Sequence, residues 1–155
     1  MSSFAMITRL EFIEASQIRI IPAGATKHEA LEILVEALCQ NPAIQNKEVF
    51  TRAVHEREAI QTTGLGNGVA VPHVRIDEVS APTVALGIAP DGLDFQALDN
   101  RPVYIIVLFA TPQDSGKTYL SLLAKVMVTL REEETFAALA ACRTVEEVTS
   151  LLGIS

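Results

Sequence analysis

An unbroken apolar run from Val103 to Ala110 constrains the fold more than any other feature of this chain. Successive side chains of a β-strand point to opposite faces, so a strand that is apolar at every position needs cover on both faces. At eight residues the run is too short to cross a bilayer, for which a helix needs about 20 residues. It therefore predicts a central strand covered on both sides, in a protein that does not insert directly into a membrane.

Helix and strand patterns alternate along the rest of the 155 residues. Further strands are predicted at 17–21 and 84–88. Capping boxes and single capping side chains predict helix starts at Thr26, Asn46, Asp114 or Ser115, and Thr144. Strands interleaved with helices are typical of an α/β fold, and the chain length fits one domain spanning residues 1–155. The pattern leaves the order of the strands open.

Composition narrows the possible functions. The chain has 12 Lys and Arg against 19 Asp and Glu, a formal net charge of −7, and no cluster of basic residues. Nucleic-acid binding depends on such clusters, so no nucleic-acid partner is expected. Cys39 and Cys142 match no zinc-binding spacing and are interpreted as buried, reduced thiols. The first residues carry no signal-peptide pattern, which predicts a cytoplasmic protein.

His73 stands out among the three histidines. It follows a turn that contains Thr63, Gly64, Gly66 and Gly68, and Pro72 fixes its entry angle. Neutral imidazole is a good nucleophile near pH 7. A phosphoryl group on that ring needs positioning and charge stabilisation, which backbone N–H groups of the turn and an arginine, Arg57 or Arg75, would supply. The alternative is a surface histidine that happens to follow a structural turn.

Other chemistries have weaker support. His28 and His55 lie on the polar sides of predicted helices, and no two histidines have the i, i+4 or His-x-His spacing of a metal site, so neither a metal nor a cofactor is expected. Gly116-Lys117-Thr118 follows the buried strand, as a phosphate-binding loop would. However, position 111 is Thr where that loop requires Gly. Nucleotide binding is therefore the less favoured interpretation.

Two segments together resemble a known family. The stretch from Arg57-Glu58 through the glycine-rich turn to His73, and the segment from Gly92 to Val103, are similar to landmarks of enzyme IIA domains of the fructose/mannitol type. These domains belong to the bacterial phosphoenolpyruvate-dependent phosphotransferase system. The resemblance implies an α/β sandwich in which helices flank both faces of a central mixed sheet. It also implies a phosphohistidine at His73, charged by an HPr-type carrier protein, with Arg57 near the phosphate.

One position departs from the family pattern. Tyr119 stands where a second family histidine is expected, early in the helix after the central strand. A tyrosine can donate a hydrogen bond to phosphate but cannot become a cation at neutral pH. The solitary domain resembles the nitrogen-regulatory branch, so the resemblance implies a phosphoryl carrier with a regulatory output. The alternatives are a sugar-specific component that passes phosphate to a permease IIB domain, and a homologue that only binds partners.

Overall fold

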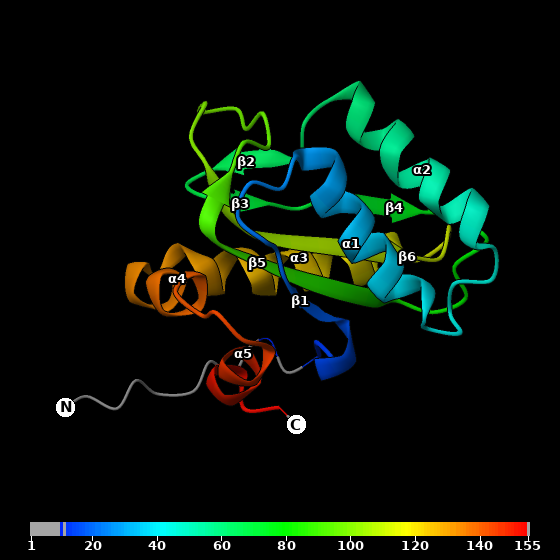
Figure 1. Ribbon diagram of the computed structural model, residues 1–155. Helices are drawn as coiled ribbons and strands as arrows, with labels where there is room; N and C mark the ends of the chain where they lie inside the picture. Colours follow the sequence, from blue (N-terminus) through cyan, green and yellow to red (C-terminus); the bar gives the residue numbers. More distant parts are fainter. Residues whose placement is uncertain (1–9, 11, 155) are drawn as a thin grey trace.

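The computed structural model describes residues 10 and 12–154 and is shown in Figure 1. In these residues a short 3-10 helix, η1 (Ala15–Gln17), precedes the first strand. The strands are β1 (Ile18–Ile20), β2 (Gly64–Gly66), β3 (Val69–Ala70), β4 (His73–Arg75), β5 (Thr83–Leu93) and β6 (Val103–Thr111). The helices are α1 (Lys27–Cys39), α2 (Lys47–Ile60), α3 (Gly116–Arg131), α4 (Glu133–Ala140) and α5 (Val145–Leu152).

The strands form one mixed sheet of order β1-β5-β6-β3-β2, and β4 also pairs with β6. β1 runs parallel to β5, and β3 and β4 run parallel to β6, whereas the β5–β6 and β2–β3 pairs are antiparallel. The long β5–β6 pair forms the centre of this sheet. The predicted α/β fold with a central mixed sheet is therefore confirmed.

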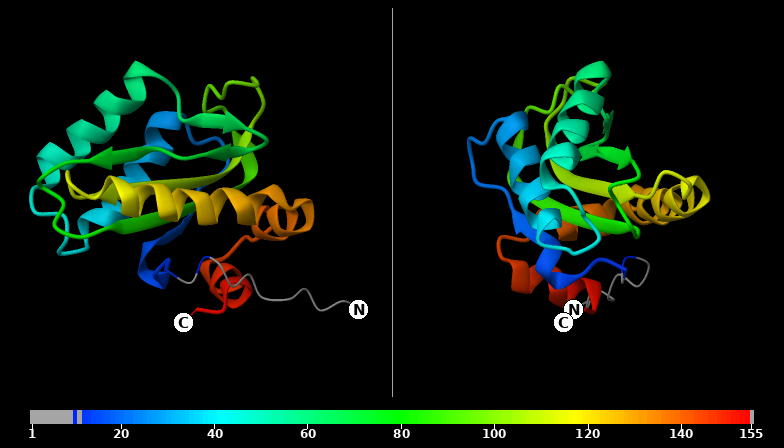
Figure 2. Two further views of the ribbon diagram at one scale, coloured as in Figure 1. Left: turned by 180° about the vertical axis from the view of Figure 1, so that it is seen from behind. Right: turned by 90° about the vertical axis from the view of Figure 1, so that its right-hand side faces the viewer.

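Strand β6 supplies apolar side chains to both faces of the sheet. Ile106, Leu108 and Ala110 join the core beneath α1 and α2. The alternate residues Ile105 and Val107, with Phe109, join the core beneath α3, α4 and α5. Figure 2 shows the sheet lying between these two groups of helices. The apolar run at 103–110 thus has the cover on both faces that its pattern predicted.

Side-chain caps set several helix boundaries where the sequence predicted them. Thr26 and Thr144 each form a complete capping box, with Glu29 and Glu147 respectively. The Asn46 side chain accepts a hydrogen bond from the backbone N–H of Val49 at the start of α2. These bonds satisfy N–H groups that a helix start would otherwise leave unpaired.

The two cysteines lie on opposite faces of the sheet. Cys39 packs against the core beneath α1 and α2, and Cys142 is buried in the core of the other face. Both are free thiols, and burial raises the pKa of each. Among the described residues, no helix is long and apolar enough to span a bilayer.

Candidate functional site

His73 opens strand β4, next to Phe109 of the central strand β6. Backbone pairing with β6 fixes this position. β4 runs parallel to β6 over three residue pairs, and His73 with Phe109 is the first of them. The backbone N–H of Phe109 also donates to the carbonyl of Pro72, 2.9 Å away. The histidine is therefore held by the best-buried strand of the molecule rather than by a free loop.

The ring of His73 has a defined tautomer. Its Nδ1 lies 3.1 Å from the backbone carbonyl oxygen of Val71. A carbonyl can only accept, so the proton of the neutral ring belongs on Nδ1 and the lone pair on Nε2. Burial lowers the pKa of His73 from 6.5, and the nearby positive charges of Arg57 and Arg75 lower it further, against opposing contributions from Val71 and Glu58. At pH 7 the ring is neutral and its Nε2 is a nucleophile.

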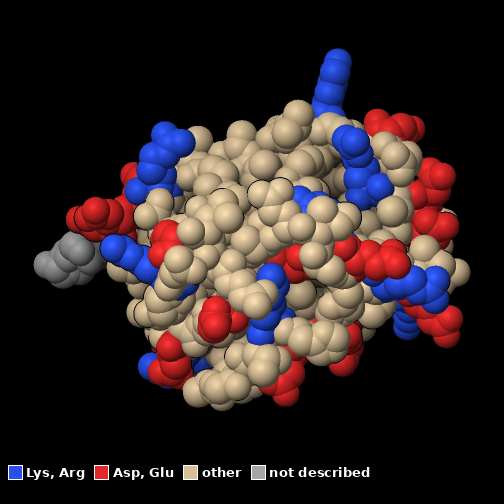
Figure 3. All heavy atoms as spheres, turned by 90° about the horizontal axis from the view of Figure 1, so that it is seen from above, with Lys and Arg blue, Asp and Glu red and all other residues tan. Residues whose placement is uncertain are grey.

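A cavity of about 770 Å³ lies beside His73. Its lining includes three cationic side chains, Arg57, Arg75 and Lys117, against one carboxylate, Glu56. The lining also includes Gly116, the first residue of α3, and a helix N-terminus carries a partial positive charge. This local excess of positive charge contrasts with the net charge of −7 of the chain. Figure 3 shows Lys and Arg side chains around a broad uncharged area of the upper surface.

Tyr119 lies against the histidine. The two rings are stacked, with centroids 4.9 Å apart and an interplanar angle of 28°. The phenol ring also makes an edge contact with Phe109, at 5.5 Å between centroids. Burial raises the pKa of Tyr119, so its hydroxyl stays protonated and can donate a hydrogen bond at neutral pH. Of the residues predicted for the site, the structure brings His73, Arg57 and Tyr119 to one cavity.

The phosphate-cradling role predicted for Thr63, Gly64, Gly66 and Gly68 stays a prediction, and the structure places these residues as follows. None of Thr63, Gly64, Gly66 and Gly68 lines the cavity. The turn of the β2–β3 hairpin packs instead against other parts of the fold, and a Cβ at Gly68 would come within 2.6 Å of the Phe136 ring. Five residues of extended chain, roughly 16 Å, lead from Gly68 to His73. The glycine is needed there for positive φ and close packing.

Thr63 links Glu58 to the strand of His73 through its backbone and its hydroxyl. The Thr63 backbone N–H and hydroxyl both donate to the buried carboxylate of Glu58, at 2.8 and 2.6 Å. The Thr63 carbonyl accepts from the N–H of Val71, whose own carbonyl accepts from His73. A continuous set of hydrogen bonds thus runs from α2 to the ring of His73.

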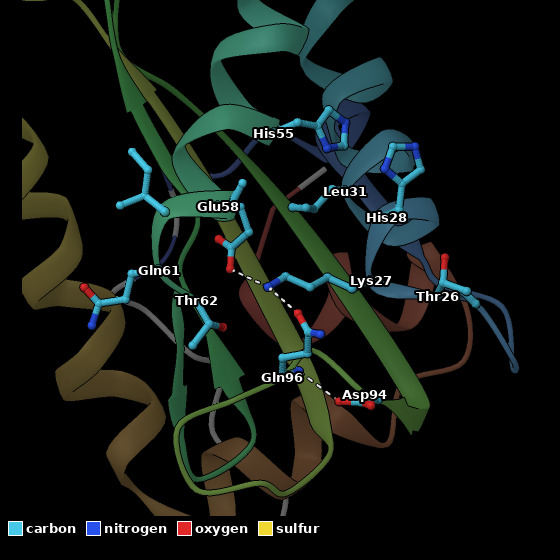
Figure 4. A pocket seen from close by; sticks show the side chains of 13 residues that line it. Thr26, Lys27, His28, Leu31, His55, Glu58, Gln61, Thr62, Asp94 and Gln96 are labelled. Atoms are coloured by element: carbon cyan, nitrogen blue, oxygen red, sulfur yellow. Dashed lines mark hydrogen bonds and ion pairs between the residues drawn. The ribbon is translucent and has the colours of Figure 1, made fainter.

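Lys27 completes this arrangement and was not predicted from the sequence. Its Nζ lies 2.8 Å from the Glu58 carboxylate, as Figure 4 shows, and above the ring of Phe95. The side chains of Lys27 and Glu58 are only 17% and 4% exposed. Their positions 31 residues apart in the sequence gave no signal of this contact, because it depends on how α1 packs against α2.

Two exposed apolar side chains flank the cavity and were also missed. Ile60 is 81% exposed and Leu120 is 61% exposed, and both belong to the lining. Ile60 ends α2, and Leu120 lies in the first turns of α3 next to Tyr119. In the sequence they read as ordinary members of amphipathic helices. Their exposure beside a charged cavity gives it an apolar rim.

Comparison with known proteins agrees with this architecture. The family model described as "Phosphoenolpyruvate-dependent sugar phosphotransferase system, EIIA 2" matches residues 11–153. The fructose-specific EIIA component of Haloferax volcanii is 31% identical over 86% of this chain and 83% of its own length. The nitrogen regulatory protein of Escherichia coli is 30% identical over 82% of this chain and 78% of its own.

A solved structure shares the fold. The nitrogen regulatory protein IIA-Ntr of Neisseria meningitidis superposes with a TM-score of 0.80 and 25% identity, covering 92% of this chain and 97% of that one. The family match extends over nearly the whole described chain and includes both sequence landmarks, which precede the central strand β6 in the sequence. This protein therefore belongs to the EIIA 2 family of the phosphoenolpyruvate-dependent sugar phosphotransferase system.

Proposed function

We propose that this protein is a phosphoryl carrier that accepts phosphate on Nε2 of His73. The observation that carries the proposal is the hydrogen bond from Nδ1 of His73 to the carbonyl of Val71. It leaves the lone pair of Nε2 as the free nucleophile, on a residue that lines a cavity with three cationic side chains. Membership of the EIIA 2 family supports the same chemistry.

The transfer step conserves atoms and charge. Nε2 of His73 attacks the phosphorus of a phosphohistidine on an HPr-type carrier, and a new N–P bond forms as the donor's N–P bond breaks. The bonding electron pair returns to the donor imidazole. Because phosphoryl transfer depends mainly on positioning and charge stabilisation, Arg57, Arg75 and Lys117 are the groups that offset the charge of the transferred oxygens.

The surface around the cavity suits a protein donor. Ile60 and Leu120 offer an apolar rim next to the charged lining. Protein interfaces commonly combine an apolar centre with charged groups that orient the partner. An HPr-type carrier docked there would bring its phosphohistidine toward Nε2. Such a partner implies a cytoplasmic location for this protein.

The Tyr119 position favours a regulatory output. Its neutral phenol can donate a hydrogen bond to a phosphate oxygen but, unlike a histidine, adds no positive charge and no second proton carrier. Phosphorylation adds about −1.5 to −2 charges beside an apolar rim, enough to change which partners bind. The nitrogen regulatory relatives are in keeping with this interpretation.

A phosphotransfer assay tests the proposal. Purified protein is incubated with phosphoenolpyruvate, enzyme I and HPr-type carriers, and compared with His73→Ala and with Arg52→Gln, an exposed control on α2. We expect acid-labile, base-stable phosphate on the wild type and on Arg52→Gln but not on His73→Ala. Circular dichroism establishes that His73→Ala is folded, so that missing label reports chemistry.

The other outcomes select the alternatives. If the phosphorylated protein passes its phosphate quickly to a fructose- or mannitol-type IIB domain, the sugar-transport function replaces the regulatory one. If no HPr-type carrier labels the folded wild-type protein, the carrier proposal fails and a homologue that only binds partners is the better account. Label on a folded His73→Ala variant would overturn the assignment of the acceptor.

A further inference from the structure

Two histidines and a glutamate meet on the surface of α1 and α2, on residues that the phosphoryl chemistry does not use. His28 and Glu32 lie one turn apart on α1, and His55 reaches them from α2. One potential ligand atom from each of the three side chains lies within 4.8 Å of the other two. Figure 4 shows the two rings beside each other, one from each helix. We propose that these three side chains form a binding site for a divalent first-row transition metal of the Zn²⁺ class.

The donor set matches that chemistry. Two imidazoles and one carboxylate are a ligand set that Zn²⁺ uses in sites with an open fourth position. Imidazole also suits copper and nickel, whereas magnesium and calcium prefer oxygen ligands. Among the described residues, the Glu32 carboxylate pairs with histidines rather than with Lys or Arg. The three groups therefore present one carboxylate and two imidazoles without a competing Lys or Arg side chain among the described residues.

The spacing is already close to that of a metal site. Nε2 of His55 lies 2.7 Å from Oε1 of Glu32, and Nε2 of His28 lies 3.7 Å from the same oxygen. Ligands about 2.0–2.1 Å from a tetrahedral metal are about 3.4 Å from each other. Metal binding would therefore lengthen the His55–Glu32 separation and slightly shorten the His28–Glu32 separation, and the His28 side chain, 71% exposed, is free to move. Rotating that ring out of its stack with His55, now at 4.6 Å between centroids, opens the site.

Room exists for the metal and its remaining ligands. His28 and His55 line the surface pocket drawn in Figure 4, and His28 and Glu32 line a second hollow on the other side. A metal bound by all three residues would have solvent-accessible space for a water molecule. The site would also join α1 to α2 next to the ion pair of Lys27 with Glu58. Metal binding would therefore stabilise the same helix pair that supports the His73 site.

Zinc titration of the metal-free protein tests the proposal. Protein dialysed against a chelator is titrated with ZnCl₂ at neutral pH by calorimetry, and we expect one site per chain. Replacing a direct ligand should weaken binding at least about tenfold, since even outer-shell changes cost 10–100-fold. This loss is expected for His28→Ala and for His55→Ala. Glu36→Gln, an exposed carboxylate one turn beyond Glu32 on α1, is the matched control and should bind as the wild type does.

Two further measurements make the result decisive. Co²⁺ at this site should give the visible absorption of a nitrogen- and oxygen-ligated tetrahedral centre, absent from His28→Ala. Zn²⁺ should raise the urea midpoint of the wild type but not of His28→Ala, because only the folded state brings the ligands together. His73→Ala should retain the site, which separates it from the phosphoryl chemistry. Absence of zinc binding, or equal binding by the wild type and both ligand variants, would overturn the proposal.

Discussion

At the scale of single residues, the position of His73 gives its ring two properties of a nucleophile: the ring is neutral, and the lone pair of Nε2 is free. Burial lowers its pKa and keeps the ring neutral near pH 7, and the Val71 carbonyl binds the Nδ1 proton. The nucleophilic nitrogen is thereby chosen by backbone geometry rather than by a neighbouring carboxylate. The positive charges of Arg57 and Arg75 act in two ways. Each lowers the pKa of His73, and in the proposed function each would attract the transferred phosphoryl group.

Replacing Arg57 with Gln should raise the pKa of His73. Burial is the largest cause of the lowered value and remains, so the pKa should move toward 6.5 without exceeding it. The unfolded chain protonates this ring near pH 6.5, whereas the folded protein does so only at lower pH. Stability conferred by the neutral ring is therefore present above pH 6.5 and is lost as the pH falls toward the folded-state pKa. In Arg57→Gln the pH interval between the folded-state pKa of His73 and 6.5, over which this stability is lost, should narrow.

The measurement is an NMR titration of the His73 imidazole in the wild type and the variant. Arg52→Gln, on the same helix α2 but exposed and outside the cavity, serves as the charge-matched control and should leave the titration unchanged. An identical His73 pKa in Arg57→Gln and wild type would show that the guanidinium does not act on the ring.

At the scale of elements, the site depends on how α1, α2 and the β2–β3 hairpin are joined. Glu58 is the common point, because its carboxylate binds Lys27 of α1 and both donors of Thr63. Two further hydrogen bonds connect Thr63 to the ring of His73: the Thr63 carbonyl accepts from the N–H of Val71, and the Val71 carbonyl accepts from Nδ1 of His73. A buried ion pair of this kind is costly to break, since the remaining charge loses both water and its partner.

Glu58→Gln should lower the free energy of unfolding by about 3 kcal/mol, a typical effect of stranding one partner of a buried pair. The amide retains the shape of the side chain but removes its negative charge, so the Lys27 ammonium is left without a countercharge. Urea unfolding of both proteins gives the difference. Lys47 is an exposed lysine at the start of the same helix, and Lys47→Met should change the free energy of unfolding by less than about 0.5 kcal/mol. A loss for Glu58→Gln no larger than that would mean the pair is not stabilising.

Local signals in the sequence predicted where helices and turns lie, but not which side chains pack against them. Thr26 and Thr144 marked helix starts because a capping box acts within four residues. The glycine pattern at 64–68 correctly indicated a turn, but a positive φ does not identify the side chain that packs against the turn, which at Gly68 is Phe136. The meeting of His28 with His55 likewise depends on the packing of two helices. It has no signature in residue spacing.

At the scale of the whole molecule, two apolar cores share one central strand. Strand β6 contributes alternate side chains to the core beneath α1 and α2 and to the core beneath α3, α4 and α5. Loss of either layer would expose one face of the same strand to water. This coupling favours a single cooperative unit over the described residues, even though the sheet separates the two sets of helices.

Leu34→Ala tests that coupling, because the two tyrosines report on the opposite face. Leu34 belongs to α1 and is fully buried, so its truncation should lower the free energy of unfolding by about 2–5 kcal/mol. Tyr104 and Tyr119 pack against the other core, and the chain has no Trp. In urea, tyrosine fluorescence and far-UV circular dichroism should shift to the same lower midpoint in this variant.

Val128→Ala, at a side chain 44% exposed on α3, is the control and should leave both midpoints nearly unchanged. A tyrosine transition that stays at its wild-type midpoint while the dichroism becomes biphasic would show that the two layers unfold independently.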